Sequence, residues 1–312
     1  MTLSLGAAED SSILNNAFSI SGDFAYFKRE EGNKHKLLID SSKTNCNCHY
    51  PSCNTKSLVH DFPFEPGFKV AVTYTTPGSV WEFSYLWLQN WERECSRSVP
   101  GSLIFSVKNP AITYDFYGAD HGSAEYSSEF QNCELNFFKY VTPRQGNYFT
   151  AAYMVGVRYM SLREALDVSF TKASDTSSYK VHAMNHIPTV QLGWLVAWLP
   201  TSTLTWDFFV KVGVGFDAGE QKTFLGDNNN TVTVRDYEES GFSTPLVAEG
   251  DIRLTYQPTS YFNIHAAYQF IYLNGVALAP DQLVKSSSNH HVYRAIGAPL
   301  IHGLTAGITW GF

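Results

Sequence analysis

The sequence contains no long apolar run. Its two longest, residues 192–199 and 151–157, have eight and seven positions, and the first is interrupted by a glycine. A transmembrane helix needs about 20 consecutive apolar residues. Helical membrane spans are therefore excluded.

Charged side chains are also scarce. They make up 16% of the chain, against about 25% in a typical soluble domain. Acidic residues exceed basic ones, 29 to 22, for a net charge of -7. A surface that binds nucleic acid needs a basic excess, so nucleic acid is excluded as a main partner. Aromatic residues are abundant at 15%, which excludes a disordered chain.

The chain has few cysteines, and all of them lie in its first half. An odd count leaves one thiol unpaired or linked to another molecule. The Cys46-Asn47-Cys48-His49 spacing fits neither a haem attachment site nor a zinc ribbon, so we expect no metal and no cofactor. Cysteine-rich loops are typical of oxidising compartments. The disulfide candidates are Cys46, Cys48, Cys53, Cys95 and Cys133.

Apolar and polar residues alternate with a period of two along much of the chain. In 204–217, one face carries Leu, Trp, Phe and Val, and the other carries Thr, Asp, Lys and Gly. These segments exceed the roughly 5–6 residues usual for soluble strands. The pattern predicts ten strands, at about 17–28, 67–76, 79–91, 128–141, 148–170, 180–199, 203–217, 244–257, 260–274 and 300–312.

The predicted connections alternate between short turns and mostly long polar loops. The long ones include roughly 30–66, 92–127, 218–243 and 275–299. Short turns at one end and long loops at the other are typical of outer-membrane barrels. We therefore expect an all-β fold, a transmembrane antiparallel up-and-down β-barrel of about ten strands (eight to twelve), with long extracellular loops and short periplasmic turns. Residues 1–16 would form a periplasmic N-terminal tail and 17–312 the barrel. A soluble β-sandwich also alternates, but its long loops do not segregate to one end.

Several segments resemble one known family. They are YSSEFQNCELN at 126–136, VGVRYMSLREAL at 155–166, YKVHAMNHIPTVQLG at 179–193 and YQFIYLNGVALAPDQL at 268–283. Their order and content resemble the outer-membrane β-barrel porin-like family of planctomycetes, which is related to chlamydia- and Legionella-type major outer-membrane proteins. The last strand, which ends in Phe312, also resembles the element that outer-membrane assembly recognises. The resemblance implies location in the bacterial outer membrane and a pore.

If the aromatic faces meet lipid, the polar faces line the lumen. An Arg or Lys at mid-bilayer on the lipid face costs about 2–4 kcal/mol, so we place the charged residues of the strands inward. This set contains six acids and four bases, which favours ion pairs within the barrel. The pairs would form either a plug or a narrow charged path. The set is Asp23, Lys69, Glu82, Glu134, Arg158, Asp207, Lys211, Glu249, Asp251 and Arg253.

Tryptophans fall mostly near the predicted strand ends, as the aromatic girdles of membrane barrels do. The predicted girdle is Trp81, Trp87, Trp91, Trp194, Trp198, Trp206 and Trp310. An enzymatic site is poorly supported. Ten-strand outer-membrane proteases carry acids and a histidine at the barrel mouth, and here only Asp120-His121, with Asp115 nearby, offers such a pair. We expect no enzyme.

Two functions remain open. The leading one is a porin-like channel for passive diffusion of ions and small polar solutes, with the lumen charges setting its selectivity. The alternative is a closed structural or adhesive barrel with disulfide-tied surface loops that forms a lattice. Expected partners are outer-membrane lipid, further copies of the chain (through a disulfide in the lattice hypothesis) and, for a channel, ions or small solutes.

Overall fold

The computed structural model describes residues 17–30, 38–40, 55–56, 62–105, 116–141, 149–227, 229, 231–283 and 293–312. The predicted tail, 1–16, lies outside these residues. No helix within the described ranges is long and apolar enough to cross a membrane.

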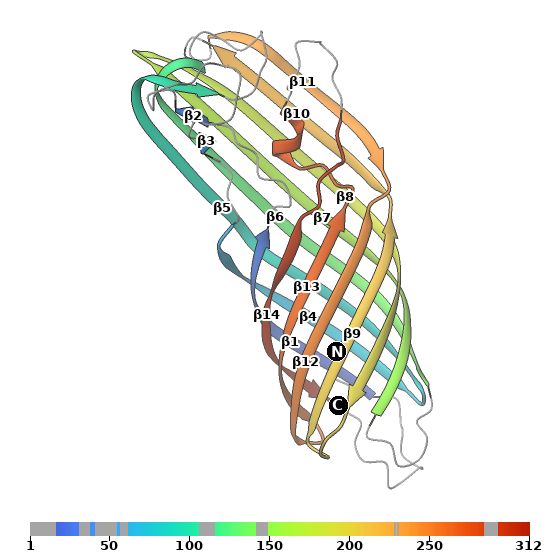
Figure 1. Cartoon of the computed structure of the whole chain (residues 1–312). Coiled ribbons are helices and arrows are strands. Elements are labelled where there is room, and N and C mark those ends of the chain that lie inside the picture. The colour runs from blue at the N-terminus through green and yellow to red at the C-terminus, as the bar shows by residue number, and fades with distance from the viewer. Residues whose placement is uncertain are drawn as a thin grey trace.

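Ten long antiparallel strands close into a barrel (Figure 1). Each pairs with its neighbours in chain order, and the first pairs with the last, so the barrel is of the up-and-down type. This confirms the predicted fold class and strand number. The strands are β1 (Ala17–Glu30), β4 (Phe64–Thr76), β5 (Ser79–Phe105), β6 (Tyr117–Val141), β7 (Phe149–Lys172), β8 (Asp175–Trp198), β9 (Leu204–Gly215), β12 (Leu246–Thr259), β13 (Phe262–Asn274) and β14 (Leu300–Gly311).

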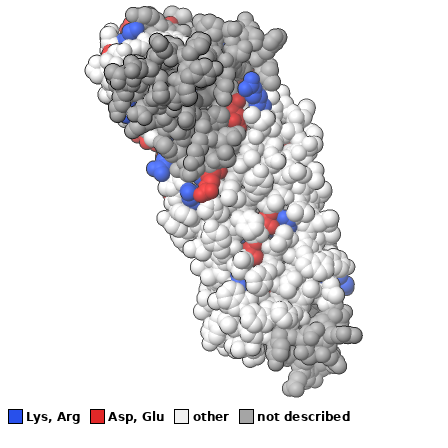
Figure 2. All heavy atoms as spheres, viewed as in Figure 1, with Lys and Arg blue, Asp and Glu red and all other residues white. Residues whose placement is uncertain are grey.

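The period-two pattern explains the two faces of the wall. On β9, Phe208, Val210 and Val212 point outward and are exposed, whereas Asp207 and Lys211 point inward and are each 4% exposed. In hydrocarbon every backbone polar group needs a hydrogen-bond partner, and in a closed barrel the neighbouring strands provide these partners for every strand. The outward apolar side chains therefore form the lipid-facing belt. In Figure 2 the lower part of the described surface carries few charges.

Above the belt, at the extracellular end, the outward residues become polar. On β7 the outward row runs from Val155, Val157 and Tyr159 to Arg163 and Asp167. Strands β5 to β8 are 24–27 residues long and carry the wall well beyond the belt.

A hairpin of β10 (Asp217–Asp227) and β11 (Val232–Ser243) extends this wall, with β10 paired to the upper part of β8. The prediction of a polar loop at 218–243 was wrong. Outward residues such as Glu220 and Lys222 face water above the belt, so the segment lacks an apolar face that would mark it as a membrane strand. Two short strands, β2 (Leu38–Asp40) and β3 (Thr55–Lys56), continue from the upper part of β5.

The upper interior is filled by an apolar core. Buried aromatic residues such as Phe27, Phe130 and Phe170 pack there with aliphatic side chains. The segment from Val276 to Leu283, which includes the 3-10 helix η2 (Ala279–Gln282), folds into this core from the β13–β14 connection. We call this segment the plug. It lies within the stretch 268–283 that carried part of the family resemblance.

Candidate functional site

The structure places all ten predicted lumen charges on the inner face of the barrel. Nine are buried, with at most 7% of each exposed, and Lys69 lines the same interior cavity as Glu82 and Asp251. They come from seven strands, β1, β4, β5, β6, β7, β9 and β12, so closure of the barrel brings distant parts of the chain together.

Four of these charges form a compact network at the centre of the lumen. The Arg158 guanidinium lies 3.1 Å from Glu134 and 2.6 Å from Glu249. The Lys211 ammonium lies 2.8 Å from Glu134 and 2.5 Å from Glu249. Two acids and two bases thus alternate across the lumen. Such mutual compensation offsets the cost of removing the charges from water.

Neutral amides complete this network. The Gln191 side chain accepts a hydrogen bond from Arg158 Nε and donates to Asn136 Oδ1. The Gln269 amide donates to Glu249. Sequence reasoning missed these amides because it selected charged residues. Their inward position in the same alternation was the signal that could have found them.

Glycines on the inner face make room for polar neighbours. A Cβ atom at Gly156 would lie 2.2 Å from Asn136 Oδ1, and one at Gly307 would lie 2.0 Å from Asp23 Oδ1. The Asp23 carboxylate in turn lies 2.5 Å from Nε2 of His265 on β13. The interior glycines therefore permit close packing rather than leaving an open lumen.

The space left between these side chains is very small. A cavity of about 20 Å³ remains beside the network, bounded by residues such as Lys69, Asp207 and Arg253. That volume holds about one water molecule. At the level of this cavity, side chains occupy most of the lumen.

The plug closes the lumen a second time, on the extracellular side of the network. Inward-facing Glu164 forms a buried ion pair with Arg29 and accepts hydrogen bonds from the Tyr126 hydroxyl, at 2.8 Å, and the Ala279 amide, at 2.9 Å. Asn185 donates to the Ala277 carbonyl at 2.8 Å and accepts from its amide at 2.7 Å. Side chains of β7 and β8 thus hold the plug through its backbone. None of these roles was predicted.

Six of the seven predicted girdle tryptophans point outward, but Trp91 is fully buried. Its placement in the girdle was wrong. A bulge in β5 between Leu88 and Trp91 reverses the alternation. The Trp91 indole instead donates a hydrogen bond to the Phe27 carbonyl at 3.1 Å, inside the upper core.

Cys95 and Cys133 are free thiols. Cys95 lies opposite Ala124, nine positions along β6 from Cys133, which is about 30 Å at the rise of a strand. A disulfide requires Cα atoms within about 7 Å, so these two cannot pair with each other. Cys46, Cys48 and Cys53 lie outside the described residues.

Asp120 and His121 lie at the extracellular tips of the hairpins, far beyond the belt. The Asp120 carboxylate accepts hydrogen bonds from the Ala173 and Gly101 amides, both at 2.8 Å, and these lower its pKa. Nδ1 of His121 lies 2.8 Å from the Ser98 hydroxyl. The Asp120 carboxylate therefore links an irregular part of β5 to the turn between β7 and β8. Asp115 lies outside the described residues, and within them no group of three or more His, Cys, Asp or Glu could hold a metal.

Comparison with known proteins gives similarity of fold alone. No family model and no curated protein matches the chain. The outer-membrane protease OmpT of Escherichia coli superimposes with a TM-score of 0.52 at 10% identity, covering 96% of this chain and 97% of OmpT. The chain has the fold of a bacterial outer-membrane β-barrel. Its closed strand ring and apolar belt place it in that membrane.

Other outer-membrane barrels match less well. The translocator domain of the autotransporter NalP from Neisseria meningitidis matches with a TM-score of 0.42 at 7% identity, covering 96% of this chain and 90% of that domain. OprG from Pseudomonas aeruginosa matches with a TM-score of 0.28 at 9% identity, covering 95% and 96%. Membership of the planctomycete porin-like family stays a prediction.

Proposed function

We propose that this protein is a closed outer-membrane barrel that acts through its extracellular surface, in a structural or adhesive role. The observation that carries the proposal is the double closure of the lumen. A charged network fills it at the level of Arg158, and the plug and the apolar core fill it above.

Passive diffusion, the leading prediction from the sequence, fits this interior poorly. A solute that crosses the lumen must separate Arg158 and Lys211 from Glu134 and Glu249. Breaking one buried ion pair by removing a partner costs about 3–5 kcal/mol. The solute must then displace the plug, whose backbone is bonded to Glu164 and Asn185.

The extracellular wall is the part of the barrel that a surface role would use. Strands β5 to β8 and the β10–β11 hairpin rise beyond the belt with polar residues on their outer face. A rigid interior is an advantage for such a scaffold, because a packed core below fixes the wall that other molecules contact. The proposal includes a lattice in which the cysteines outside the described residues form disulfides between copies of the chain.

A permeability assay tests the proposal. Purified protein is folded into liposomes, and swelling is followed in isotonic glucose, arabinose and potassium chloride, with a general porin as the positive control. We expect rates equal to those of empty liposomes. Swelling that increases with the amount of folded protein would favour the passive channel. Gels with and without reductant then test the lattice: covalent oligomers that reductant dissolves support it, and monomers alone contradict it.

A further inference from the structure

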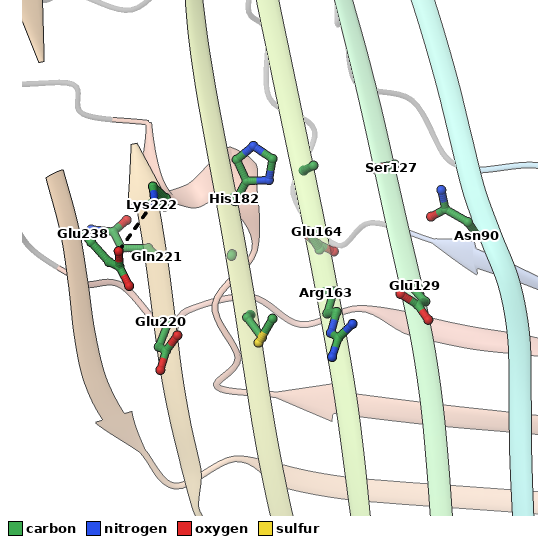
Figure 3. A pocket seen from close by; sticks show the side chains of 13 residues that line it. Asn90, Ser127, Glu129, Arg163, Glu164, His182, Glu220, Gln221, Lys222 and Glu238 are labelled. Carbon is green, nitrogen blue, oxygen red and sulfur yellow. Dashed lines mark ion pairs between the residues drawn. The ribbon is translucent and has the colours of Figure 1, made fainter. Parts of the chain in front are cut away.

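A groove of about 530 Å³ lies on the outer face of the wall, across β6, β7, β8 and β10 (Figure 3). The outward side chains that shape it are Glu129, Arg163, His182, Met184, Glu220 and Lys222. We call it the outer groove. It is separate from the lumen, so what it binds does not depend on whether the lumen is open.

Two neighbouring rows of cross-strand partners explain the hollow. Long side chains stand in one row, where Glu129 pairs with Arg163, Arg163 with Met184 and Met184 with Glu220. In the next row, Ser127 pairs with Ala165, and Ala165 with His182. The short Ser127 and Ala165 therefore form a floor, and longer side chains form the rim.

The outer groove lies directly above the lipid belt. Tyr159, whose hydroxyl lies 2.5 Å from Nδ1 of His186, belongs to the same outward row of β7 as Arg163. Aromatic side chains of this kind mark the membrane interface. Four residues of strand separate Tyr159 from Arg163, about 13 Å along the strand and roughly 10 Å in height at the usual tilt. Arg163 thus stands at the headgroups of the extracellular leaflet.

Two charged side chains in the outer groove, Arg163 and Glu220, lack partners. Neither the Arg163 side chain nor the Glu220 side chain forms an ion pair or hydrogen bond within the described ranges, although Glu129 stands directly across from Arg163. Lys222 has only a loose contact, 3.7 Å, with Glu238. A free guanidinium on the rim can bind a phosphate through two parallel hydrogen bonds. A free carboxylate can accept hydrogen bonds from sugar hydroxyls.

We propose that the outer groove binds the phosphorylated sugar headgroup of a glycolipid in the extracellular leaflet. Arg163 contacts the phosphate, with Lys222 and His182 behind it, and Glu220 contacts sugar hydroxyls. Two features favour this ligand: the height of the groove, which places it among the lipid headgroups, and its mixture of free donors and acceptors.

The test uses purified deep-rough lipopolysaccharide as the probe and the folded protein in detergent, with affinity measured by microscale thermophoresis. We expect Arg163→Ala to lower the affinity at least tenfold and Glu220→Gln to lower it by a smaller factor. Lys139→Ala, which removes an outward lysine near the periplasmic end of β6, is the matched control and leaves the affinity unchanged. Because these side chains are at the surface, the variants keep the parent melting temperature.

Two further arms separate the headgroup from other ligands. Dephosphorylated lipopolysaccharide should bind at least tenfold more weakly than the intact molecule. Inorganic phosphate at millimolar concentration should not displace the lipopolysaccharide. Equal affinity of the parent and Arg163→Ala, equal binding of the dephosphorylated glycolipid, or displacement by phosphate alone would each overturn the proposal.

Discussion

Replacement of Arg158 by methionine should strongly destabilise the barrel. Arg158 is the only residue besides Lys211 that forms an ion pair with Glu134 or Glu249 within the described part of the chain. In the variant, two buried carboxylates face one ammonium, so the four-charge network goes from neutral to one uncompensated negative charge. Removal of one partner of a buried pair costs about 3–5 kcal/mol. We expect the free energy of unfolding to fall by about that amount.

The assay is urea unfolding in lipid vesicles, followed by tryptophan fluorescence. Arg163→Met is the matched control, because Arg163 is outward and unpaired, and its free energy should stay within about 0.5 kcal/mol of the parent. The double variant Arg158→Met with Glu249→Gln restores neutrality around Glu134 and Lys211. It should therefore be more stable than Arg158→Met alone, because the two sites couple.

Either of two results would refute the role of charge balance in this network. One is a loss below about 1 kcal/mol for Arg158→Met, which would mean that water compensates the carboxylates and that the lumen is wet. The other is a double variant less stable than Arg158→Met, which would mean that the charge balance of the network does not determine how much it stabilises the barrel.

Three other predictions follow from the contacts. Asn185→Leu removes both hydrogen bonds to Ala277 and should speed deuterium exchange of residues 276–283, measured by mass spectrometry; unchanged exchange would contradict the role of Asn185. The Ala173 and Gly101 amides hold the pKa of Asp120 below its ordinary value near 3.8. The stabilisation that the Asp120 carboxylate gives is therefore present above pH 3.8 and is lost as the pH falls through the lowered pKa. Protection of the Ala173 amide from exchange should therefore drop upon acidification in the parent but be low at every pH in Asp120→Ala, and a pH-independent parent would refute this. Brominated lipid should quench the tryptophan fluorescence of a variant that retains only Trp91 weakly, and that of a variant that retains only Trp81 strongly. Equal quenching would place both indoles at the lipid.

The strands could be predicted because the membrane imposes a period of two on them. Each of the ten predicted ring strands has its counterpart, and the inward charges followed from the same alternation. The rule fails where the belt ends. In residues 217–243 the side chains of both faces meet polar surroundings, so the sequence shows no apolar face there that would indicate a strand. The bulge before Trp91 exchanges the inward and outward faces of β5, and no residue type in the sequence indicates it.

The closure of the lumen could not be predicted from the sequence. The period-two alternation gives the face on which Glu164 and Asn185 lie, but their contacts with the plug join residues about a hundred positions apart. The partners of such polar groups depend on how the barrel closes and which loop folds inward. The sequence therefore left both plug and pore open, with the pore as the leading prediction, and the packing of the interior favours the plug.

Single-channel recording of the folded protein in a planar bilayer tests the closed lumen most directly. The network and the plug predict a flat trace at 100 mV in 1 M potassium chloride, from protein whose insertion and folding are verified by its heat-modifiable mobility on gels. Stable, uniform conductance steps from the parent protein, with a reversal potential that Glu249→Gln shifts, would contradict the account and restore the charge-lined channel.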